Sequence, residues 1–118
     1  MKVLIADDDP PSREALGTLA ACYGHEVFVC ADGIEAVAAV SWFSPDLIIL
    51  DVEMPRMDGI SAARSLIELF PLAQWRLVAY TGQTSPEQRE ATIAAGFTEH
   101  FCKPYDLAKL EHILGTGA

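Results

Sequence analysis

Basic residues are scarce in this sequence, which has 8 lysines and arginines against 17 aspartates and glutamates and a formal net charge of -9. Binding to the phosphate backbone of a nucleic acid needs clustered Lys and Arg side chains. The scarcity of positive charge therefore argues against direct nucleic-acid binding. The simplest interpretation of the acidity is solubility, and the alternative is an acidic pocket that needs a cation.

Long apolar runs and cysteine clusters are also absent. No apolar stretch approaches the roughly 18 residues of a membrane-spanning helix, and no signal peptide precedes the apolar run that begins at Val3. The three cysteines, Cys22, Cys30 and Cys102, have no metal-like spacing. An odd number of cysteines, two of which lie next to apolar runs, is typical of reduced, buried thiols in a cytoplasmic protein. We therefore expect a cytoplasmic protein without membrane contact.

No linker, internal repeat or low-complexity segment interrupts the 118 residues, 51% of which are hydrophobic. A chain of this length can bury a core without disulfides or metals. We therefore expect one globular domain over residues 1–118, in which residues 115–118 form a frayed tail.

Short apolar runs recur along the chain and leave room for a helix between each pair. Unbroken runs cover residues 3–6, 47–50 and 77–80, and less apolar runs cover residues 25–30 and 98–102. Unbroken runs of this length are typical of strands in a parallel sheet that is buried on both faces. The less apolar run over residues 25–30 is predicted to lie at an edge of the sheet.

Helical patterns fill the segments between these runs. The residues predicted to face inward are Leu16, Leu19, Ala20 and Tyr23 in the first helix, Ile34, Val37 and Ala38 in the second, Ile60, Ala63, Ile67 and Phe70 in the third, and Leu107, Leu110 and Leu114 in the last. The fourth helix is predicted to begin after Ser85, which is a suitable cap. Five strands and five helices in strict alternation predict a doubly wound α/β sheet with helices on both faces.

A residue suited to phosphate or metal chemistry follows four of the predicted strands. Asp7 and Asp8 follow the first strand, Asp51 the third, Thr81 the fourth and Lys103 the fifth. In parallel sheets ligands bind at the carboxyl ends of the strands. Three carboxylates, a hydroxyl and an ammonium could hold a divalent cation and a phosphoryl group, and a carboxylate can itself accept a phosphoryl group. Each residue alone could equally be a turn or cap residue, but independent turn residues have no reason to fall at four strand ends.

These motifs resemble the receiver domain of two-component response regulators. The resemblance covers essentially all 118 residues and is carried by residues 3–10, 45–59, 80–82 and 103–104, of which the second segment is the most specific. It implies a flavodoxin-like receiver fold, with a five-stranded parallel sheet of order 2-1-3-4-5 and five helices. It also implies a signalling switch and not an enzyme, one that catalyses at most its own phosphorylation and dephosphorylation.

The resemblance implies a role for each acidic residue. Asp51 would accept a phosphoryl group from a phosphohistidine on a histidine kinase or phosphotransfer protein. Asp8 would bind Mg²⁺ directly, Asp7 directly or through water, and Asp51 and the backbone carbonyl of Glu53 would complete the protein ligands. Asp9 has no metal role in the family, and we interpret it as a cap or a surface charge.

The resemblance also implies how the signal is read. Thr81 and Lys103 would bind the phosphoryl oxygens, with the Lys103–Pro104 peptide in the cis form. Phosphorylation would draw Thr81 toward the phosphate, and the surface of the fourth helix, fifth strand and fifth helix would signal to a downstream effector domain or protein. The kinase would dock on the first helix and the loop around Pro104 and Tyr105, and a homodimer through the signalling surface is left open.

Some positions depart from the family pattern. Receivers usually have Tyr or Phe three residues before the lysine, where this chain has His100. His100 is either a replacement switch or a solvent-facing strand residue, whereas Phe101 should point to the opposite face as core. Glu53 and Gln83 occupy the positions whose side chains tune access of water to the acyl phosphate.

Two other functions remain as alternatives. The first is a phosphorylation-independent docking module of receiver type, although such modules usually lack part of the acidic set that this chain retains. The second is a haloacid-dehalogenase-type phosphatase, which needs an Asp-x-Asp motif, but the residue two after Asp51 is Glu53.

Overall fold

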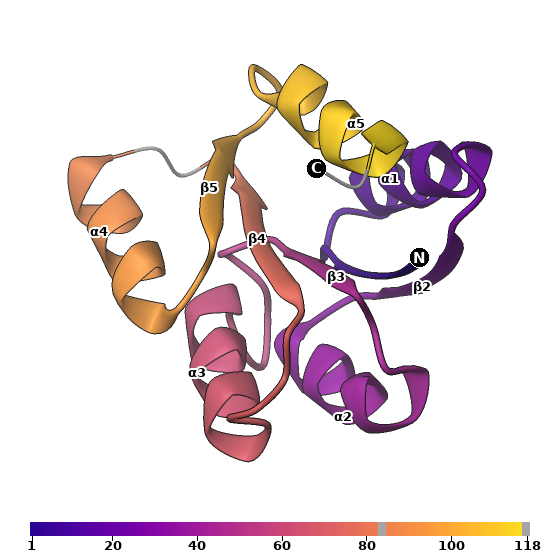
Figure 1. The fold of residues 1–118 in the computed structure, drawn as a ribbon. Coiled ribbons are helices and arrows are strands. Elements are labelled where there is room, and N and C mark those ends of the chain that lie inside the picture. The colour runs from indigo at the N-terminus through magenta and orange to yellow at the C-terminus, as the bar shows by residue number, and fades with distance from the viewer. Residues whose placement is uncertain (83–84, 117–118) are drawn as a thin grey trace.

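The computed structural model describes residues 1–82 and 85–116, in which five strands and five helices alternate (Figure 1). The strands are β1 (Lys2–Ala6), β2 (Glu26–Cys30), β3 (Leu47–Leu50), β4 (Arg76–Thr81) and β5 (Glu99–Cys102). The helices are α1 (Pro10–Cys22), α2 (Gly33–Phe43), α3 (Gly59–Leu69), α4 (Pro86–Ala95) and α5 (Leu107–Thr116). Within this described part of the chain, none of the helices has the length and hydropathy needed to cross a membrane.

The five strands form one parallel sheet of order β2-β1-β3-β4-β5. Helices α1 and α5 cover one face of this sheet, and α2, α3 and α4 cover the other (Figure 1). The predicted doubly wound fold is therefore confirmed. The edge position predicted for the second strand is confirmed as well.

Successive residues of each strand point to opposite faces, which gives the sheet two apolar layers. From β1, Val3 and Ile5 pack in the layer with α1 and α5, whereas Leu4 and Ala6 pack in the layer with α2, α3 and α4. These four side chains are at most 1% exposed. Burial on both faces explains why the strand sequences are apolar without interruption.

Polar side chains fix where four of the helices begin. Asp9, Asp32, Asp58 and Ser85 each accept a hydrogen bond from the backbone N–H three residues later. These bonds satisfy donors at the helix start that have no partner within the helix. The capping role predicted for Ser85 is confirmed, and Asp9 has the capping role that was one of its two interpretations.

The inward face predicted for α2 is wrong. Its buried residues are Gly33, Ala36, Ala39, Val40 and Phe43, whereas Ile34 is 45% exposed and Ala38 is also exposed. Apolar residues occur all around this helix, so their spacing selects no single face. The packing decides which face is buried, and Gly33 approaches Met57 so closely that an added Cβ would lie 2.5 Å from the Met57 carbonyl oxygen.

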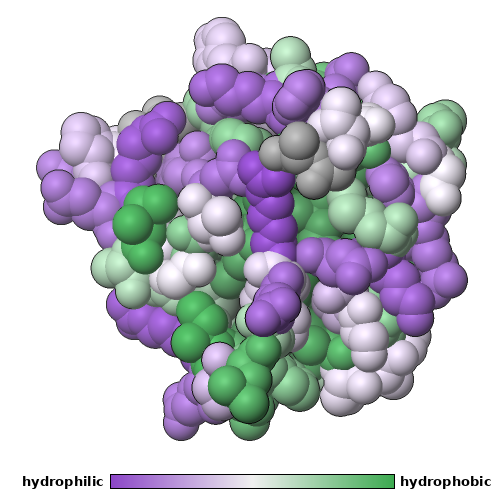
Figure 2. Space-filling view, in the orientation of Figure 1, coloured by the Kyte–Doolittle hydropathy of each residue, from purple (hydrophilic) through white to green (hydrophobic). Residues whose placement is uncertain are grey.

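The inward face of α3 is rotated relative to the prediction. Its buried residues are Gly59, Ala62, Ala63 and Leu66, and Ile67 is 40% exposed. Ile67 instead lies beside the end of α4, where a Cβ added to Gly96 would come within 2.0 Å of its Cδ1. Figure 2 shows hydrophobic side chains over this part of the surface.

The frayed tail predicted for residues 115–118 is wrong at its first two positions, because Gly115 and Thr116 belong to α5. The Thr116 hydroxyl donates to the carbonyl of His112 at 2.7 Å. The His25 Nε2 lies 2.5 Å from the carbonyl oxygen of Leu114. These contacts hold the end of α5, and residues 117 and 118 lie outside the described residues.

Candidate functional site

The residues predicted to bind phosphate and metal lie at the carboxyl edge of the sheet. Asp7 and Asp8 directly follow β1, Asp51 follows β3, Thr81 ends β4, and Lys103 follows β5. The strands β1, β3, β4 and β5 are neighbours in this order and run parallel. Their ends therefore meet at one edge, which is where sheets of this kind bind ligands.

Three carboxylates form a cluster at this edge. One oxygen each of Asp7, Asp8 and Asp51 lies within 4.8 Å of the others. Asp7 is 2% exposed, Asp51 is partly buried and Asp8 is exposed. Carboxylates this close together repel one another, so the cluster requires positive charge or bound protons.

Lys103 supplies positive charge to the cluster. Its Nζ donates to Asp7 Oδ2 at 2.5 Å and to Asp51 Oδ2 at 3.0 Å. The Lys103 N–H donates to the carbonyl of Thr81 at 2.8 Å, and the Lys103–Pro104 peptide is cis, as predicted. Burial by itself would lower the pKa of Lys103, but the hydrogen bonds to the two carboxylates outweigh burial and raise it. The ammonium therefore stays charged.

Asp51 has different partners on its two oxygens. Oδ2 contacts Lys103, whereas Oδ1 accepts the backbone N–H of Glu53 at 3.2 Å. Burial raises the pKa of Asp51, the hydrogen bond and charge of Lys103 lower it, and the charge of Asp7 raises it again, so the net pKa is above its ordinary value. The ionised form of Asp51 is thus held in an environment that disfavours it.

The first turn of α1 supports Asp7, a contribution that the motifs at the strand ends do not indicate. The Ser12 hydroxyl donates to Asp7 Oδ2 at 2.8 Å, and the Asp9 N–H donates to Asp7 Oδ1 at 3.0 Å. The Arg13 side chain donates to the Asp7 carbonyl at 2.9 Å. A helix that follows a strand after a connection of only three residues places its first side chains near the end of that strand, and this spacing is a signal for Ser12.

Thr81 lies at the end of β4 with 1% exposure, and its carbonyl accepts the hydrogen bond from Lys103. Glu53 lies in the loop after β3 and is exposed. Gln83, predicted to tune access of water, lies outside the described residues.

His100 does not face solvent, so this interpretation of the residue is wrong. It is 7% exposed, and its Nδ1 lies 2.8 Å from Thr92 Oγ1 on α4, which covers this part of β5. Thr92 Oγ1 also donates to the carbonyl of Arg89 at 2.8 Å. Both bonds form together only if His100 Nδ1 carries a proton, because a carbonyl can only accept. Phe101 points to the opposite face and packs in the layer with α1 and α5, as predicted.

The cysteines divide by burial. All three are free, and Cys30 is buried while Cys22 is exposed. Burial raises the pKa of Cys30 to about 12, with the charges of Glu35 and Asp32 acting in the same direction. Cys30 is therefore an inert core thiol, and Cys102 is partly buried.

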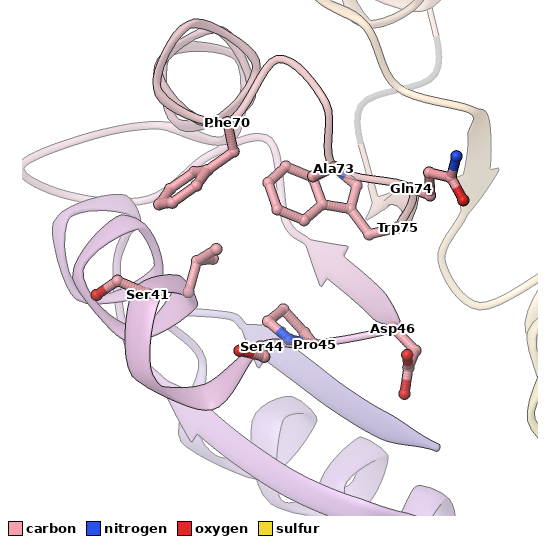
Figure 3. Close-up of a pocket in the computed structure, with 9 residues that line it drawn as sticks. Ser41, Ser44, Pro45, Asp46, Phe70, Ala73, Gln74 and Trp75 are labelled. Carbon is pink, nitrogen blue, oxygen red and sulfur yellow. The ribbon is translucent and has the colours of Figure 1, made fainter.

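A cleft of about 560 Å³ opens beside the acidic cluster. It is lined by Asp8, Val52, Glu53, Met54, Pro55, Asp58, Ile60 and Gln88. A different pocket of about 360 Å³ lies at the opposite end of the sheet, where the Phe70 and Trp75 rings approach each other at 5.8 Å (Figure 3). None of the predicted site residues lines this second pocket, so the cleft beside Asp8 is the candidate entrance to the site.

The donor set at the sheet edge fits Mg²⁺. This ion prefers hard oxygen ligands, usually one or two carboxylates together with water and substrate phosphate. Asp7, Asp8 and Asp51 are the only group of three or more potential metal ligands among the described residues, and all their donors are carboxylate oxygens. The exposure of Asp8 leaves room for water or a phosphoryl group. The site can therefore bring a cation, an ammonium and a phosphoryl group to one carboxylate.

The comparisons with known proteins agree with this geometry. The family model of the response regulator receiver domain matches residues 3–115. The signal transduction histidine-protein kinase BarA of Escherichia coli (strain K12) is 31% identical over 114 residues, which are 97% of this chain and 12% of that protein. Response regulator MprA of Mycobacterium leprae is 34% identical over 110 residues, which are 93% of this chain and 47% of that protein.

A solved structure extends the comparison. The receiver domain of sensor histidine kinase PA1611 from Pseudomonas aeruginosa PAO1 matches with a TM-score of 0.85 and 28% identity, covering 96% of this chain and 93% of that one. That structure has a magnesium ion coordinated in its active site cleft. The chain spans less than half the length of the two relatives above, so it corresponds to one part of each. The family match, the relatives and the shared fold together show that this chain belongs to the response regulator receiver domains of two-component systems.

Proposed function

We propose that this receiver domain is a phosphorylation switch in which Asp51 accepts a phosphoryl group in a Mg²⁺-dependent reaction. The observation that carries the proposal is the position of Lys103, whose Nζ contacts both Asp7 and Asp51 beside the exposed Asp8. This arrangement surrounds one partly buried carboxylate with the charges that a phosphoryl group requires. The likeness to a histidine kinase and a response regulator supports a phosphohistidine as the donor.

The transfer uses groups that this chain holds in place. A carboxylate oxygen of Asp51 attacks phosphorus while the bond between phosphorus and the donor imidazole nitrogen breaks. The departing nitrogen takes the electron pair, and the product is an acyl phosphate on Asp51. Lys103 binds one phosphoryl oxygen as a compact charge, and the Thr81 hydroxyl donates to another.

The acidic cluster would hold the metal. Asp8 and Asp51 would bind Mg²⁺ through carboxylate oxygens, Asp7 would bind directly or through water, and the backbone carbonyl of Glu53 would add a ligand. When bound, Mg²⁺ supplies the positive charge that offsets repulsion between the phosphoryl oxygens and the carboxylate. Asp7 is buried and accepts a hydrogen bond from the Ser12 hydroxyl, so the position of its carboxylate in the metal site is fixed.

Phosphorylation would change the local charge and thereby the conformation. The acyl phosphate adds about −1.5 to −2 charges next to Lys103. Thr81 would move toward the phosphate and carry the start of α4 with it, and the surface of α4, β5 and α5 would report the state to a downstream effector. In this scheme the domain catalyses at most its own phosphorylation and dephosphorylation.

Phosphorylation by acetyl phosphate tests the proposal. The purified domain is incubated with and without Mg²⁺, and the intact mass is measured for the wild type, Asp51→Asn and Asp9→Asn. Asp9→Asn removes a neighbouring charge while keeping an oxygen for its cap. We expect a Mg²⁺-dependent gain of one phosphoryl group in the wild type and in Asp9→Asn, and none in Asp51→Asn. Phosphorylation that persists in Asp51→Asn would reject the assignment, and no gain in a protein that binds Mg²⁺ would favour the docking module.

A further inference from the structure

The loop between β3 and α3, residues 51–58, is packed against the start of α2. The Gly33 N–H of α2 donates to the carbonyl of Met57 at 3.0 Å. A Cβ added to Gly33 would lie 2.5 Å from that same carbonyl oxygen, a distance that real side chains do not reach. The loop also closes on itself, because the Gly59 N–H donates to the carbonyl of Val52 at 2.8 Å. The position of the loop is therefore tied to α2.

Arg56 adds a side-chain bond between the same two segments. Its Nε and Nη2 lie 2.8 Å and 2.5 Å from Asp32 Oδ2. The Asp32 side chain is only 5% exposed, and its other oxygen accepts the Glu35 N–H at 2.9 Å. One carboxylate oxygen thus caps α2 and the other holds the loop. The Glu35 N–H and then the Arg56 guanidinium keep the pKa of Asp32 below its ordinary value, so Asp32 remains ionised.

The backbone of Arg56 is in a conformation that needs support. Its φ is 64°, in the left-handed region that residues other than glycine rarely adopt. Such conformations persist only where the surroundings determine them. The Met57 N–H donates to the carbonyl of Pro55 at 2.7 Å across this residue, and the Arg56 Nη2 lies 3.8 Å from Glu35 Oε2. The ion pair with Asp32 is the shortest of the side-chain contacts that hold Arg56 in place.

We propose that the Arg56–Asp32 ion pair positions the loop that completes the phosphoacceptor site. The loop places the Glu53 N–H on Asp51 Oδ1 at 3.2 Å, so a shift of the loop would change the orientation of the Asp51 carboxylate. The same loop carries the Glu53 carbonyl that would bind the metal. Arg56 and Asp32 are accordingly positioning residues, which act on the site through Glu53. The inference rests on the proposed function, because it concerns the same metal site.

Mg²⁺ binding by Arg56→Gln distinguishes positioning from a simple charge effect. Loss of a positive charge alone would make the site more negative and strengthen Mg²⁺ binding. If the loop of residues 51–58 were instead displaced, Mg²⁺ binding would weaken, as happens when residues that orient metal ligands are removed. We expect Mg²⁺ affinity to fall by about 10-fold, measured by isothermal titration calorimetry on the whole chain. Arg56→Lys, which retains the charge but not the two-point contact, should fall between the wild type and Arg56→Gln.

Asp32→Asn provides the matched variant, because it keeps an oxygen for the α2 cap and removes only the charge. It should weaken Mg²⁺ binding about as much as Arg56→Gln, and the double variant should be no weaker than either single variant. Arg64→Gln is the control, since it removes an equal charge from an exposed position on α3 and should bind Mg²⁺ as well as the wild type or slightly better. Urea unfolding identifies conditions in which every variant is fully folded.

The possible outcomes separate the two proposals. A folded wild-type domain that does not bind Mg²⁺ would reject the proposed function. Wild-type binding together with equal or tighter binding by Arg56→Gln would overturn the positioning role alone. A fall in affinity that is equally large in Arg64→Gln would also overturn it, because that residue lies outside the ion pair.

Discussion

Among the individual residues, Lys103 determines the charge balance of the site. Its ammonium is shared between Asp7 and Asp51, two carboxylates from different strand ends. A compact ammonium on a flexible stem can transfer from a carboxylate to a phosphoryl oxygen a short distance away, whereas the planar fork of Arg is suited to one fixed geometry. A lysine at this position therefore suits a site whose anion changes during function.

The raised pKa of Asp51 predicts a difference in stability between the wild type and Asp51→Asn. A folded-state pKa above the unfolded value means that Asp51 favours folding while it is protonated, and this contribution is lost as the pH rises through the folded pKa. At neutral pH the ionised carboxylate therefore opposes folding. Without divalent cations, Asp51→Asn should be more stable than the wild type by roughly 0.5–2 kcal/mol at neutral pH.

Urea unfolding measures this difference, and its pH dependence identifies the cause. The advantage of Asp51→Asn should shrink as the pH is lowered, because the raised pKa means that Asp51 becomes protonated at a higher pH than an ordinary aspartate. Asp9→Asn serves as the control, because it lies beside the cluster without belonging to it. A wild type that is more stable than Asp51→Asn at neutral pH would show that the bond to Lys103 outweighs burial and the charge of Asp7.

The sequence predicts some site residues and misses others for a physical reason. Asp51 and Lys103 follow apolar runs, so parallel strands are enough to bring both residues to the same edge of the sheet. The sequence does not predict the role of Arg56, because this role depends on how the loop after β3 packs against α2, whereas the short spacing between β1 and α1 is a signal for Ser12. For His100, strand alternation predicts which face of the sheet the side chain lies on, but it cannot predict that α4 covers this face.

Between elements, one buried polar contact connects β5 to α4. The His100 Nδ1 and the Thr92 hydroxyl lie 2.8 Å apart, and Thr92 is fully buried. Polar groups in such a place are costly to separate, because each would lose a partner away from water. The contact therefore restricts how far α4 can move relative to β5, which is the motion that the proposed signalling requires.

Thr92→Val tests the energy of this contact. The substitution preserves the shape of the side chain and removes the hydroxyl partner of His100, so we expect the free energy of unfolding to fall by about 1–3 kcal/mol. In the His100→Phe protein the hydroxyl of Thr92 has no imidazole partner to lose. Thr92→Val should therefore change the free energy of unfolding of that protein by an amount close to zero. Urea unfolding of the four proteins gives the coupling energy. An equal loss in both backgrounds would mean that Thr92 acts through other contacts.

The helices show how far periodicity can predict an element. In α5, Leu110 and Leu114 are buried as expected, because they lie on a single apolar stripe. In α2, apolar residues occur on every side, and the helix is oriented by the close approach of Gly33 to Met57. A pattern of hydrophobic residues thus predicts that a helix exists more reliably than it predicts which side is buried.

For the molecule as a whole, alternation of strands and helices predicts the architecture, but it does not order the strands. Runs such as residues 47–50 must be buried on both faces, and this requires helices on each side of the sheet. The order 2-1-3-4-5 followed from the resemblance to receivers, and the structure confirms it. Periodicity alone cannot give this order, because it describes each segment separately and contains no information about pairing.

The cluster of Asp7, Asp8 and Asp51 predicts that Mg²⁺ binding stabilises the entire domain against unfolding. A ligand that binds only the folded state adds RT ln(1 + [L]/Kd) to stability, about 2.7 kcal/mol at 100 times Kd. We therefore expect Tm to rise by roughly 10 °C in saturating Mg²⁺.

Because the chain has a net charge of -9, salt also stabilises it by screening, so NaCl at matched ionic strength is the necessary control. Asp8→Asn should lose most of the Mg²⁺-specific increment while remaining folded, since Asp8 is exposed. Equal increments from MgCl₂ and matched NaCl would mean that the cluster responds to screening and not to a bound ion.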